Sequence, residues 1–170
     1  MKSYEQKDLI QLISDLYKNS KEVQSYLSVR FLGEEAVSEL FNQTRKKIEN
    51  EFFPEKGFGK LRLNEAKKAI TEFKKHTNDE FKTTDLMLFY VEQGVEYTNA
   101  YGDINESFYS SMETMYEKVI TLCGKHEDYY KAFADRLKQV VHDTEGIGWG
   151  FHDQLYYLHS ELECWDMEDE

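Results

Sequence analysis

The spacing of the apolar residues constrains this chain more than any other feature of its sequence. Along nearly the whole chain they recur every three or four positions, which places them on one face of an α-helix, and no stretch alternates with the period of two typical of a half-buried strand. The 170 residues contain a single proline, Pro54, so little interrupts the backbone hydrogen bonds of long helices. We therefore predict an all-α fold in a single compact domain, long enough to bury a core.

Capping residues and glycines divide this pattern into seven or eight antiparallel helices with short connections. We expect Ser20 to cap the second helix and Gly33 to end it. Asn64 is expected to cap a later helix. Asp103 is expected to cap another, with Glu106 completing a capping box. The helices can pack as a bundle or as an irregular, HEAT-like stack of helix pairs, and the sequence leaves both arrangements open.

The apolar positions of each helix form a stripe that is expected to face the core. In the first helix this stripe consists of Leu9, Leu12, Ile13 and Leu16. In the last helix it consists of Phe151, Leu155, Leu158 and Leu162. Residues 85–101, DLMLFYVEQGVEYTNAY, are apolar on most sides, which predicts a central helix with several neighbours. We assign residues 1–162 to the helical domain and residues 163–170 to an acidic C-terminal tail.

Charge is distributed unevenly along the chain. The net charge is −12, and residues 45–76 contribute +5 of it, from ten basic and five acidic residues. The overall charge argues against a general nucleic-acid binder, which must neutralise phosphates. The basic segment defines a belt, whose main residues are Arg45, Lys46, Lys47, Lys60, Arg62, Lys67 and Lys68. We favour solvated helix faces as the explanation of this belt; the alternative is docking of an acidic partner surface, including that of a second copy.

Targeting and crosslinking features are absent from the pattern of residues. Cys123 and Cys164 form neither a C-x-x-C motif nor a disulfide framework. The amphipathic N-terminus lacks the apolar core of a signal peptide, and no apolar run is long enough to span a membrane. We expect a cytoplasmic protein without a membrane partner.

The segment HDTEGIGWGFHDQL, residues 142–155, is the first candidate site. Its glycines suit a close corner between two helices, with Gly146 at a positive φ that ends the first of them. The same small residues suit a ligand surface on which Trp149 stacks, with His152 and Asp153 at the start of a helix. We favour the corner, because close packing already accounts for the glycines.

The segment VEQGVEYTNAYGDINE, residues 91–106, is the second candidate. Glu92 and Glu96 share one helix face, and further polar groups crowd the turn that follows. We favour an internal hydrogen-bond network over a pocket, because buried polar groups need partners. If the two segments meet, the candidate ligand pocket consists of Trp149, His152, Asp153, Glu96, Tyr97, Asn99 and Asp103.

Recognised catalytic and metal-binding patterns do not occur. No histidine follows a glutamate by three residues, and there is no H-E-x-x-H, G-x-S-x-G, Walker or Rossmann motif. His152 and His159 share a helix face with Glu163, a weak metal pattern, and Cys123 falls beside an apolar stripe. We expect no cofactor and no metal.

Three segments resemble an uncharacterised bacterial family known as domain of unknown function 6155. They are KLRLNEAKKAI, DLMLFYVEQGVEYTNAYGDINESFY and DTEGIGWGFHDQL. The resemblance spans the first to the last predicted helix and implies a small bacterial helical protein. It brings no activity or catalytic residue.

The sequence does not identify the function. We favour a non-catalytic helical module for protein interaction or regulation, with a protein partner and self-association as one option. The alternative is a small-molecule binding protein or enzyme, with a pocket where Trp149 and His152 meet Tyr97 and Asp103.

Overall fold

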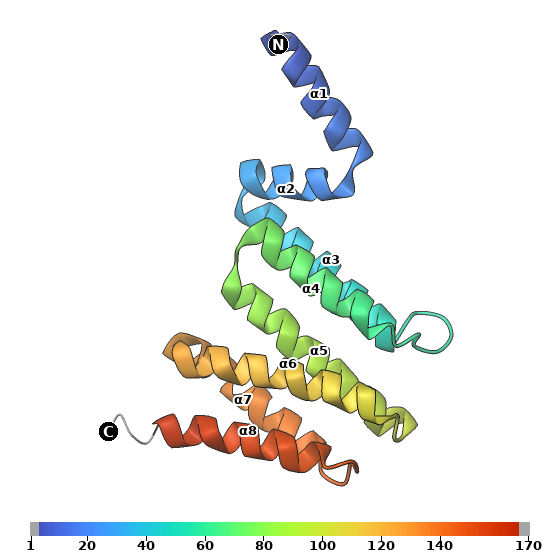
Figure 1. The fold of residues 1–170 in the computed structure, drawn as a ribbon, viewed down its shortest axis with the longest axis vertical. Coiled ribbons are helices and arrows are strands. Elements are labelled where there is room, and N and C mark those ends of the chain that lie inside the picture. The colour runs from blue at the N-terminus through green and yellow to red at the C-terminus, as the bar shows by residue number, and fades with distance from the viewer. Residues whose placement is uncertain (1–3, 167–170) are drawn as a thin grey trace.

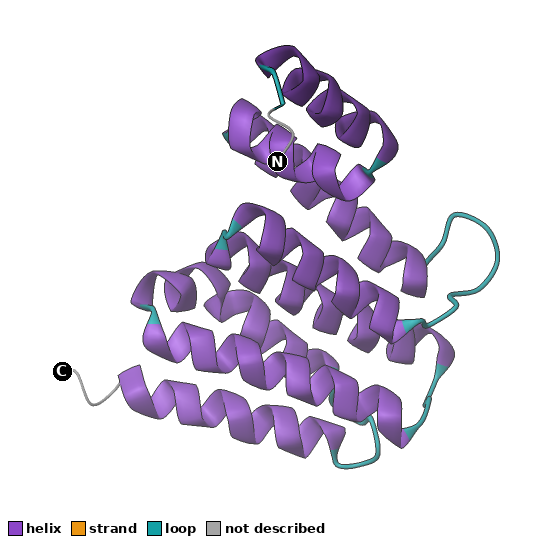
Figure 2. Cartoon of the chain, turned by 45° about the horizontal axis from the view of Figure 1, so that its top comes forward, coloured by secondary structure: helices purple, strands orange, loops and turns teal. Residues whose placement is uncertain are grey.

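The computed structural model describes residues 4–166, and the side chains of residues 4–162, as eight α-helices joined by short connections (Figures 1 and 2). The helices are α1 (Gln6–Asn19), α2 (Lys21–Leu32), α3 (Glu34–Phe52), α4 (Leu63–Thr77), α5 (Glu80–Tyr101), α6 (Glu106–Lys125), α7 (Glu127–Asp143) and α8 (Phe151–Asp166). No strand occurs in this described part, which confirms the all-α prediction.

The helices form a stack rather than a closed bundle. Every extensive helix–helix contact joins helices that are one or two positions apart in the chain, from α1 with α2 to α7 with α8. Figure 1 shows the consequence: α1 lies at one end of the longest axis, α8 lies at the other, and α5 lies between α3 and α6. Of the two arrangements left open by the sequence, the structure has the stack of helix pairs.

Helix α5 is the centre of the stack and packs against α3, α4, α6 and α7. Twelve of its residues are buried, in agreement with the central helix predicted for residues 85–101. At Gly94 the neighbouring helix comes so close that a Cβ atom would lie 2.3 Å from Sδ of the buried Met112. Only a glycine permits this approach of α6 to α5 without displacing Met112.

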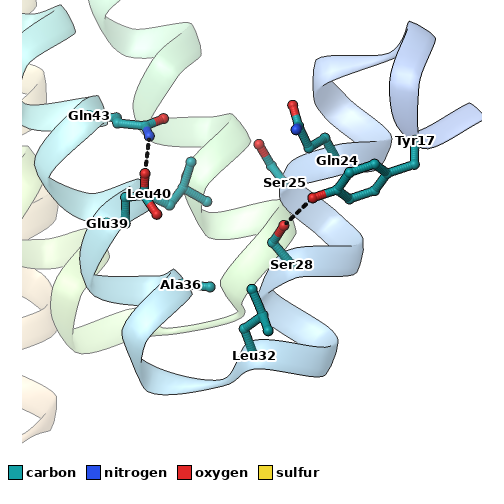
Figure 3. Close-up of a pocket in the computed structure, with 9 residues that line it drawn as sticks. All are labelled: Tyr17, Gln24, Ser25, Ser28, Leu32, Ala36, Glu39, Leu40 and Gln43. Carbon is teal, nitrogen blue, oxygen red and sulfur yellow. Dashed lines mark hydrogen bonds between the residues drawn. The ribbon is translucent and has the colours of Figure 1, made fainter.

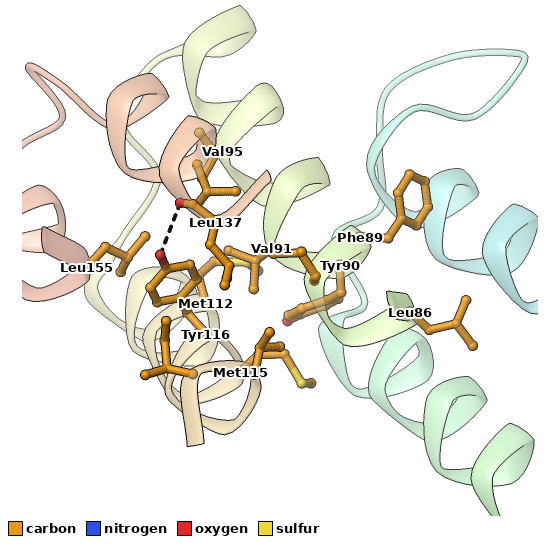
Figure 4. Close-up of a cluster of buried hydrophobic side chains, with 14 of the residues drawn as sticks. Leu86, Phe89, Tyr90, Val91, Val95, Met112, Met115, Tyr116, Leu137 and Leu155 are labelled. Carbon is orange, nitrogen blue, oxygen red and sulfur yellow. Dashed lines mark hydrogen bonds between the residues drawn. The ribbon is translucent and has the colours of Figure 1, made fainter. Parts of the chain in front are cut away.

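Large tyrosines fill the core around α5, and their hydroxyls find partners (Figure 4). Tyr116 donates a hydrogen bond to the carbonyl of Leu137 at 3.1 Å, and Tyr90 Oη lies 2.9 Å from Ser111 Oγ. Burial raises the pKa of Tyr90 to about 12, so this side chain stays neutral. Each tyrosine thus adds apolar area to the core without leaving a polar atom unpaired.

Two predicted boundaries of α2 are confirmed. Ser20 Oγ accepts a hydrogen bond from Val23 N at 3.3 Å, and Gly33, at φ +65°, ends the helix. At this position the left-handed backbone favours glycine.

Two other predicted caps are wrong. Asn105, in an extended conformation, caps α6 by accepting from Phe108 N at 3.0 Å, whereas Asp103 lies two residues too early and accepts from Tyr109 Oη. Helix α4 begins at Leu63, so Asn64 lies inside its first turn. The preceding backbone turn, with Leu61 at φ +50°, sets that start in place of a side-chain cap.

The first apolar stripe does not face the core, contrary to the prediction. Leu9, Leu12, Ile13 and Leu16 are each 45–51% exposed. Neither α1 nor α2 contains a buried residue, whereas the predicted stripe of α8 is fully buried. The reason is position: α1 is the end of the stack and makes its extensive contacts with α2 alone.

The first half of the segment predicted as an acidic tail belongs to the last helix. Helix α8 continues to Asp166, so residues 163–166 are helical. Residues 167–170 lie outside the described part of the chain.

We expect core and end-of-stack leucines to differ sharply in their contribution to stability. Leu88→Ala empties a site with no solvent exposure in α5, and this should lower the free energy of unfolding by about 2–5 kcal/mol. Leu16→Ala on α1 should cost less than about 1 kcal/mol, since water already reaches this side chain. Urea unfolding at low protein concentration measures both. Equal losses would contradict the peripheral position of α1.

Candidate functional site

Nine of the sixteen exposed large apolar side chains in the described structure lie on α1 and α2. We call them the N-terminal apolar face: Leu9, Ile10, Leu12, Ile13, Leu16, Tyr17, Tyr26, Phe31 and Leu32. Each is 37–77% exposed. Single exposed apolar residues are ordinary on a protein surface, but Ile13, Tyr17, Phe31 and Leu32 line one groove, and grouped apolar residues of this kind mark interaction sites.

An apolar groove of about 400 Å³ runs between α1 and α2 within this face. The residues that line it are Ile13, Ser14, Tyr17, Lys18, Leu27, Ser28, Phe31 and Leu32. Most of the lining is aliphatic or aromatic, and its polar groups lie at the edge of α1 and the middle of α2. Such a groove suits the apolar face of an amphipathic helix.

A polar groove of about 290 Å³ lies on the other side of α2, between α2 and α3 (Figure 3). It shares Tyr17, Ser28 and Leu32 with the apolar groove, so the two grooves adjoin. Tyr17 Oη lies 3.5 Å from Ser28 Oγ, and this contact and Gln24 lower the pKa of Tyr17. The end of the stack therefore combines an apolar surface with adjacent hydrogen-bonding groups.

This end of the molecule is also electrically balanced. Residues 4–32 contain four basic and four acidic residues, so their net charge is zero in a chain of net charge −12. A partner that approaches α1 and α2 is therefore neither attracted nor repelled by net charge, unlike at residues 77–170, whose net charge is −15.

The sequence alone does not reveal this surface, because an apolar stripe has the same spacing of residues on a helix that a neighbour covers and on one that is exposed. One signal was present: Ile10 lies outside the predicted stripe, and Phe31 and Leu32 are adjacent at the end of α2. A helix with apolar residues beyond the width needed for one neighbour indicates a second contact surface.

The glycine-rich segment 142–155 is a tight corner between α7 and α8. Gly146 has the predicted positive φ, +85°, but α7 already ends at Asp143 with Thr144 as its C-cap. Trp149 and Gly150 are also left-handed, at φ +65° and +70°. His152 Nδ1 lies 3.0 Å from Thr144 Oγ1, so a side-chain hydrogen bond joins the two ends of the corner. Trp149 is 60% exposed.

The two candidate segments are neighbours in space, but their side chains point in different directions. A Cβ at Gly148 would lie 3.6 Å from Asp103 Oδ2, and Asn99 donates to the carbonyl of Asp143 at 2.8 Å. Tyr97, in contrast, is buried and lies against Phe53, with ring centroids 5.7 Å apart. The corner and the turn thus meet, while Tyr97 faces α3.

The remaining residues of the predicted pocket lie on two different helices, α8 and α5. Asp153 is exposed on α8, and the exposed Glu96 accepts a hydrogen bond from Gln93. Glu96 and Asn99 line a groove of about 460 Å³ between α5 and α7, and that groove's lining does not include Trp149, His152 or Asp103.

An ion-pair network fixes α7 to α5 beside that groove. Arg136 donates to Glu92 at 2.7 and 2.8 Å and to Asp85 at 2.7 Å. All three side chains are only 24–32% exposed. Burial alone would lower the pKa of Arg136, but the hydrogen bonds to both carboxylates outweigh it and raise the pKa. The polar residues around Glu92 therefore form an internal network.

Some residues of the basic belt already form ion pairs with acidic residues of the same chain. Arg62 donates to both carboxylate oxygens of the buried Glu51. Lys46 pairs with Glu55, Lys68 pairs with Glu72, and Arg45 lies 3.9 Å above the ring of Phe89. Lys47, Lys60 and Lys67 make no ion pair with any described residue.

No group of three or more His, Cys, Asp or Glu side chains suited to a metal ion occurs among the residues the structure describes. Within the weak metal pattern, His152 lies against Thr144 and His159 is buried, while the side chain of Glu163 lies outside the described residues. Cys123 is buried, and burial raises the pKa of its thiol to about 12. Cys164 also lies outside the described side chains.

In the described part of the chain, every helix is too short or too polar to cross a lipid bilayer. Comparison with known protein families finds one match: residues 1–162 match a family of unknown function, DUF6155. Neither the curated proteins nor the solved structures include a match to this chain.

The Cys123 thiol should be unreactive while the protein is folded. A pKa near 12 leaves little thiolate at neutral pH, so in a Cys164→Ser background we expect alkylation roughly a thousandfold slower than for an ordinary thiol. Iodoacetamide labelling followed by mass spectrometry measures the rate, and labelling in urea is the positive control. Rapid labelling of the folded protein would contradict this burial.

Removing the cation of the α5–α7 network should destabilise the fold. Arg136→Met leaves Glu92 and Asp85 partly buried without their partner, which should cost about 1–3 kcal/mol of unfolding free energy. Lys138→Met, at an exposed position of the same helix, is the matched control and should cost little. Urea unfolding distinguishes them, and equal stability of the two variants would show that the network is not structural.

Proposed function

We propose that this chain, which belongs to the DUF6155 family, is a non-catalytic helical module that binds another protein through its N-terminal apolar face. The single observation that carries this proposal is the exposure of nine large apolar side chains on the two helices at the end of the stack, four of which line one groove. Terminal units of helical stacks ordinarily present a polar outer face to water. An apolar outer face is explained if a partner protein covers it.

The size of this face supports a specific protein contact. With roughly 150–200 Å² for a large apolar side chain, the exposed fractions of the nine residues sum to on the order of 700–950 Å². A standard stable interface buries about 800 Å² on each partner. The exposed apolar area of α1 and α2 is therefore of the same order as one side of such an interface.

The rest of the molecule supports a scaffold role for this face. The core around α5 is tightly packed, and ion pairs connect α3 to the loop before α4 and α5 to α7. The stack holds α2 against α3 and α4, so the polar groove between α2 and α3 is preformed and a partner does not have to order it.

The alternative class, a small-molecule binding protein or enzyme, rests on the meeting of the 142–155 corner with the turn at Asp103. It has narrower support, because Tyr97 packs against Phe53 and Trp149 projects into solvent. Docking through the basic belt likewise has narrower support, because Glu51, Glu55 and Glu72 already pair with belt residues.

The cellular setting is part of the same proposal. We place the protein in the bacterial cytoplasm, on the grounds that two cysteines without a disulfide framework suit a reducing compartment. A protein partner there, with a helix or helix pair as its contact surface, fits the apolar groove.

Photocrosslinking in the native cell tests the proposed function. A benzophenone amino acid in place of Phe31 should form a covalent adduct with a discrete protein, because this side chain borders the groove. Phe58, on the loop between α3 and α4, is the matched control: it is 76% exposed against 77% for Phe31. Adduct formation at position 31 and not at position 58 is expected. Equal or no adduct at both positions would overturn the proposal.

A further inference from the structure

We propose that the protein covering the N-terminal apolar face is a second copy of this chain, so that α1 and α2 of two copies form a symmetric four-helix contact. This inference rests on the proposed function and names its partner. It differs from the self-association considered for the basic belt, because the contact is made by apolar side chains and not by ion pairs.

Charge favours this end of the stack as the place where two copies meet. Residues 77–170, which include α5 to α8, contain 6 basic and 21 acidic residues, a net charge of −15, whereas residues 4–32 are neutral. Two copies that approach through α5 to α8 repel each other. The basic belt would instead attract an acidic surface, but several of its residues already form ion pairs within the chain. Contact through α1 and α2 keeps the two acidic segments at opposite ends of the dimer, so repulsion between them is small there.

The shape of the face suits contact with itself. Phe31 is both a wall of the apolar groove and its most exposed large side chain. In a two-fold arrangement the same patch occurs on both sides, so Phe31 of each copy can enter the groove beside Ile13 of the other. The α1 stripe at Leu9, Leu12 and Leu16 repeats at intervals of three and four, which is the spacing of helix pairs that interdigitate in four-helix bundles.

The other end of the stack does not offer a matching surface. Within the described side chains of α8, the exposed large apolar residues are Tyr156 and Tyr157, and Tyr157 donates its hydroxyl to Glu161 at 2.8 Å. A head-to-tail contact would therefore place aliphatic side chains of α1 against a polar, acidic helix. This asymmetry favours a closed two-fold dimer over an open chain of copies.

A membrane surface fits the face less well than a second copy does. Helices that lie on anionic lipid present many lysines and arginines on their polar side. Helix α1 has Lys7 and Lys18 against Asp8 and Asp15, so its polar side is neutral. Binding to lipid is therefore an alternative outcome of the experiment described next.

Molar mass in solution tests the inference. Size-exclusion chromatography with light scattering, from low micromolar to several hundred micromolar protein, should give twice the 20.2 kDa chain mass for the wild type. Phe31→Lys, and independently Ile13→Lys, should give the monomer mass, with dissociation at least about a hundredfold more favourable, because each buries a charge in the contact. Circular dichroism should show unchanged helix content, since both side chains are exposed in the isolated chain.

Phe58→Lys is the matched control and should remain a dimer, because that equally exposed phenylalanine lies outside the face. A monomeric wild type across the whole range overturns the inference, and so does a Phe31→Lys variant that remains dimeric. Wild-type cosedimentation with phosphatidylglycerol vesicles that Phe31→Lys abolishes also overturns it, in favour of lipid.

Failure of this inference is distinguishable from failure of the proposed function. A monomeric wild type whose position 31 crosslinks to a different protein removes the second copy and leaves the interaction module in place. A monomeric wild type without any crosslink at position 31 removes both. A crosslinked adduct with twice the chain mass supports both.

Discussion

Helix α5 has buried side chains around most of its circumference, so it needs neighbours on several sides at once. The chain meets this need by packing α3 and α4 on one side of it and α6 and α7 on the other. Burial follows from this arrangement: α3 to α8 each contribute buried residues, and α1 and α2 contribute none. The first two helices make no extensive contact with α5, and of their apolar residues only Val29 packs, partly buried, against the core.

The polar groups inside the stack fix how its helices pack. Each buried side-chain nitrogen or oxygen in the described part has a hydrogen-bond partner. Arg136 reaches two carboxylates on α5, and Arg62 brings the loop after α3 back onto Glu51. Because breaking one partner of such a pair leaves the other charge poorly solvated, these contacts specify one packing among the many that apolar side chains would tolerate.

Helical periodicity was enough to predict the fold class, the central position of residues 85–101 and the buried stripe of α8. Each of these depends on the apolar pattern within a single helix. The cap of α6 at Asn105 and the start of α4 at Leu63 were not predictable, because they depend on the backbone angles of the preceding turns, and the sequence does not distinguish them from candidates such as Asp103 and Asn64. The exposure of α1 was not predictable either, because it depends on the order of helices in space. For the candidate pocket, the sequence offered the meeting of the corner and the turn as an alternative. The structure brings Gly148 close to Asp103, whereas the orientation of Tyr97 toward Phe53 depends on tertiary packing that the sequence does not show.

The restriction of helix contacts to near neighbours in the chain has a consequence for synthesis on the ribosome. No helix waits for a partner more than two helices downstream, so structure can accumulate in the order in which the segments emerge. Helices α1 and α2 precede the rest of the stack; α2 later packs against α3 and α4, whereas α1 gains no extensive contact from any helix after α2. The apolar stripe of α1 is therefore exposed both before and after α3 to α8 have been made. If two copies pair through this stripe as proposed, nascent chains on neighbouring ribosomes of one messenger can pair before either chain is finished.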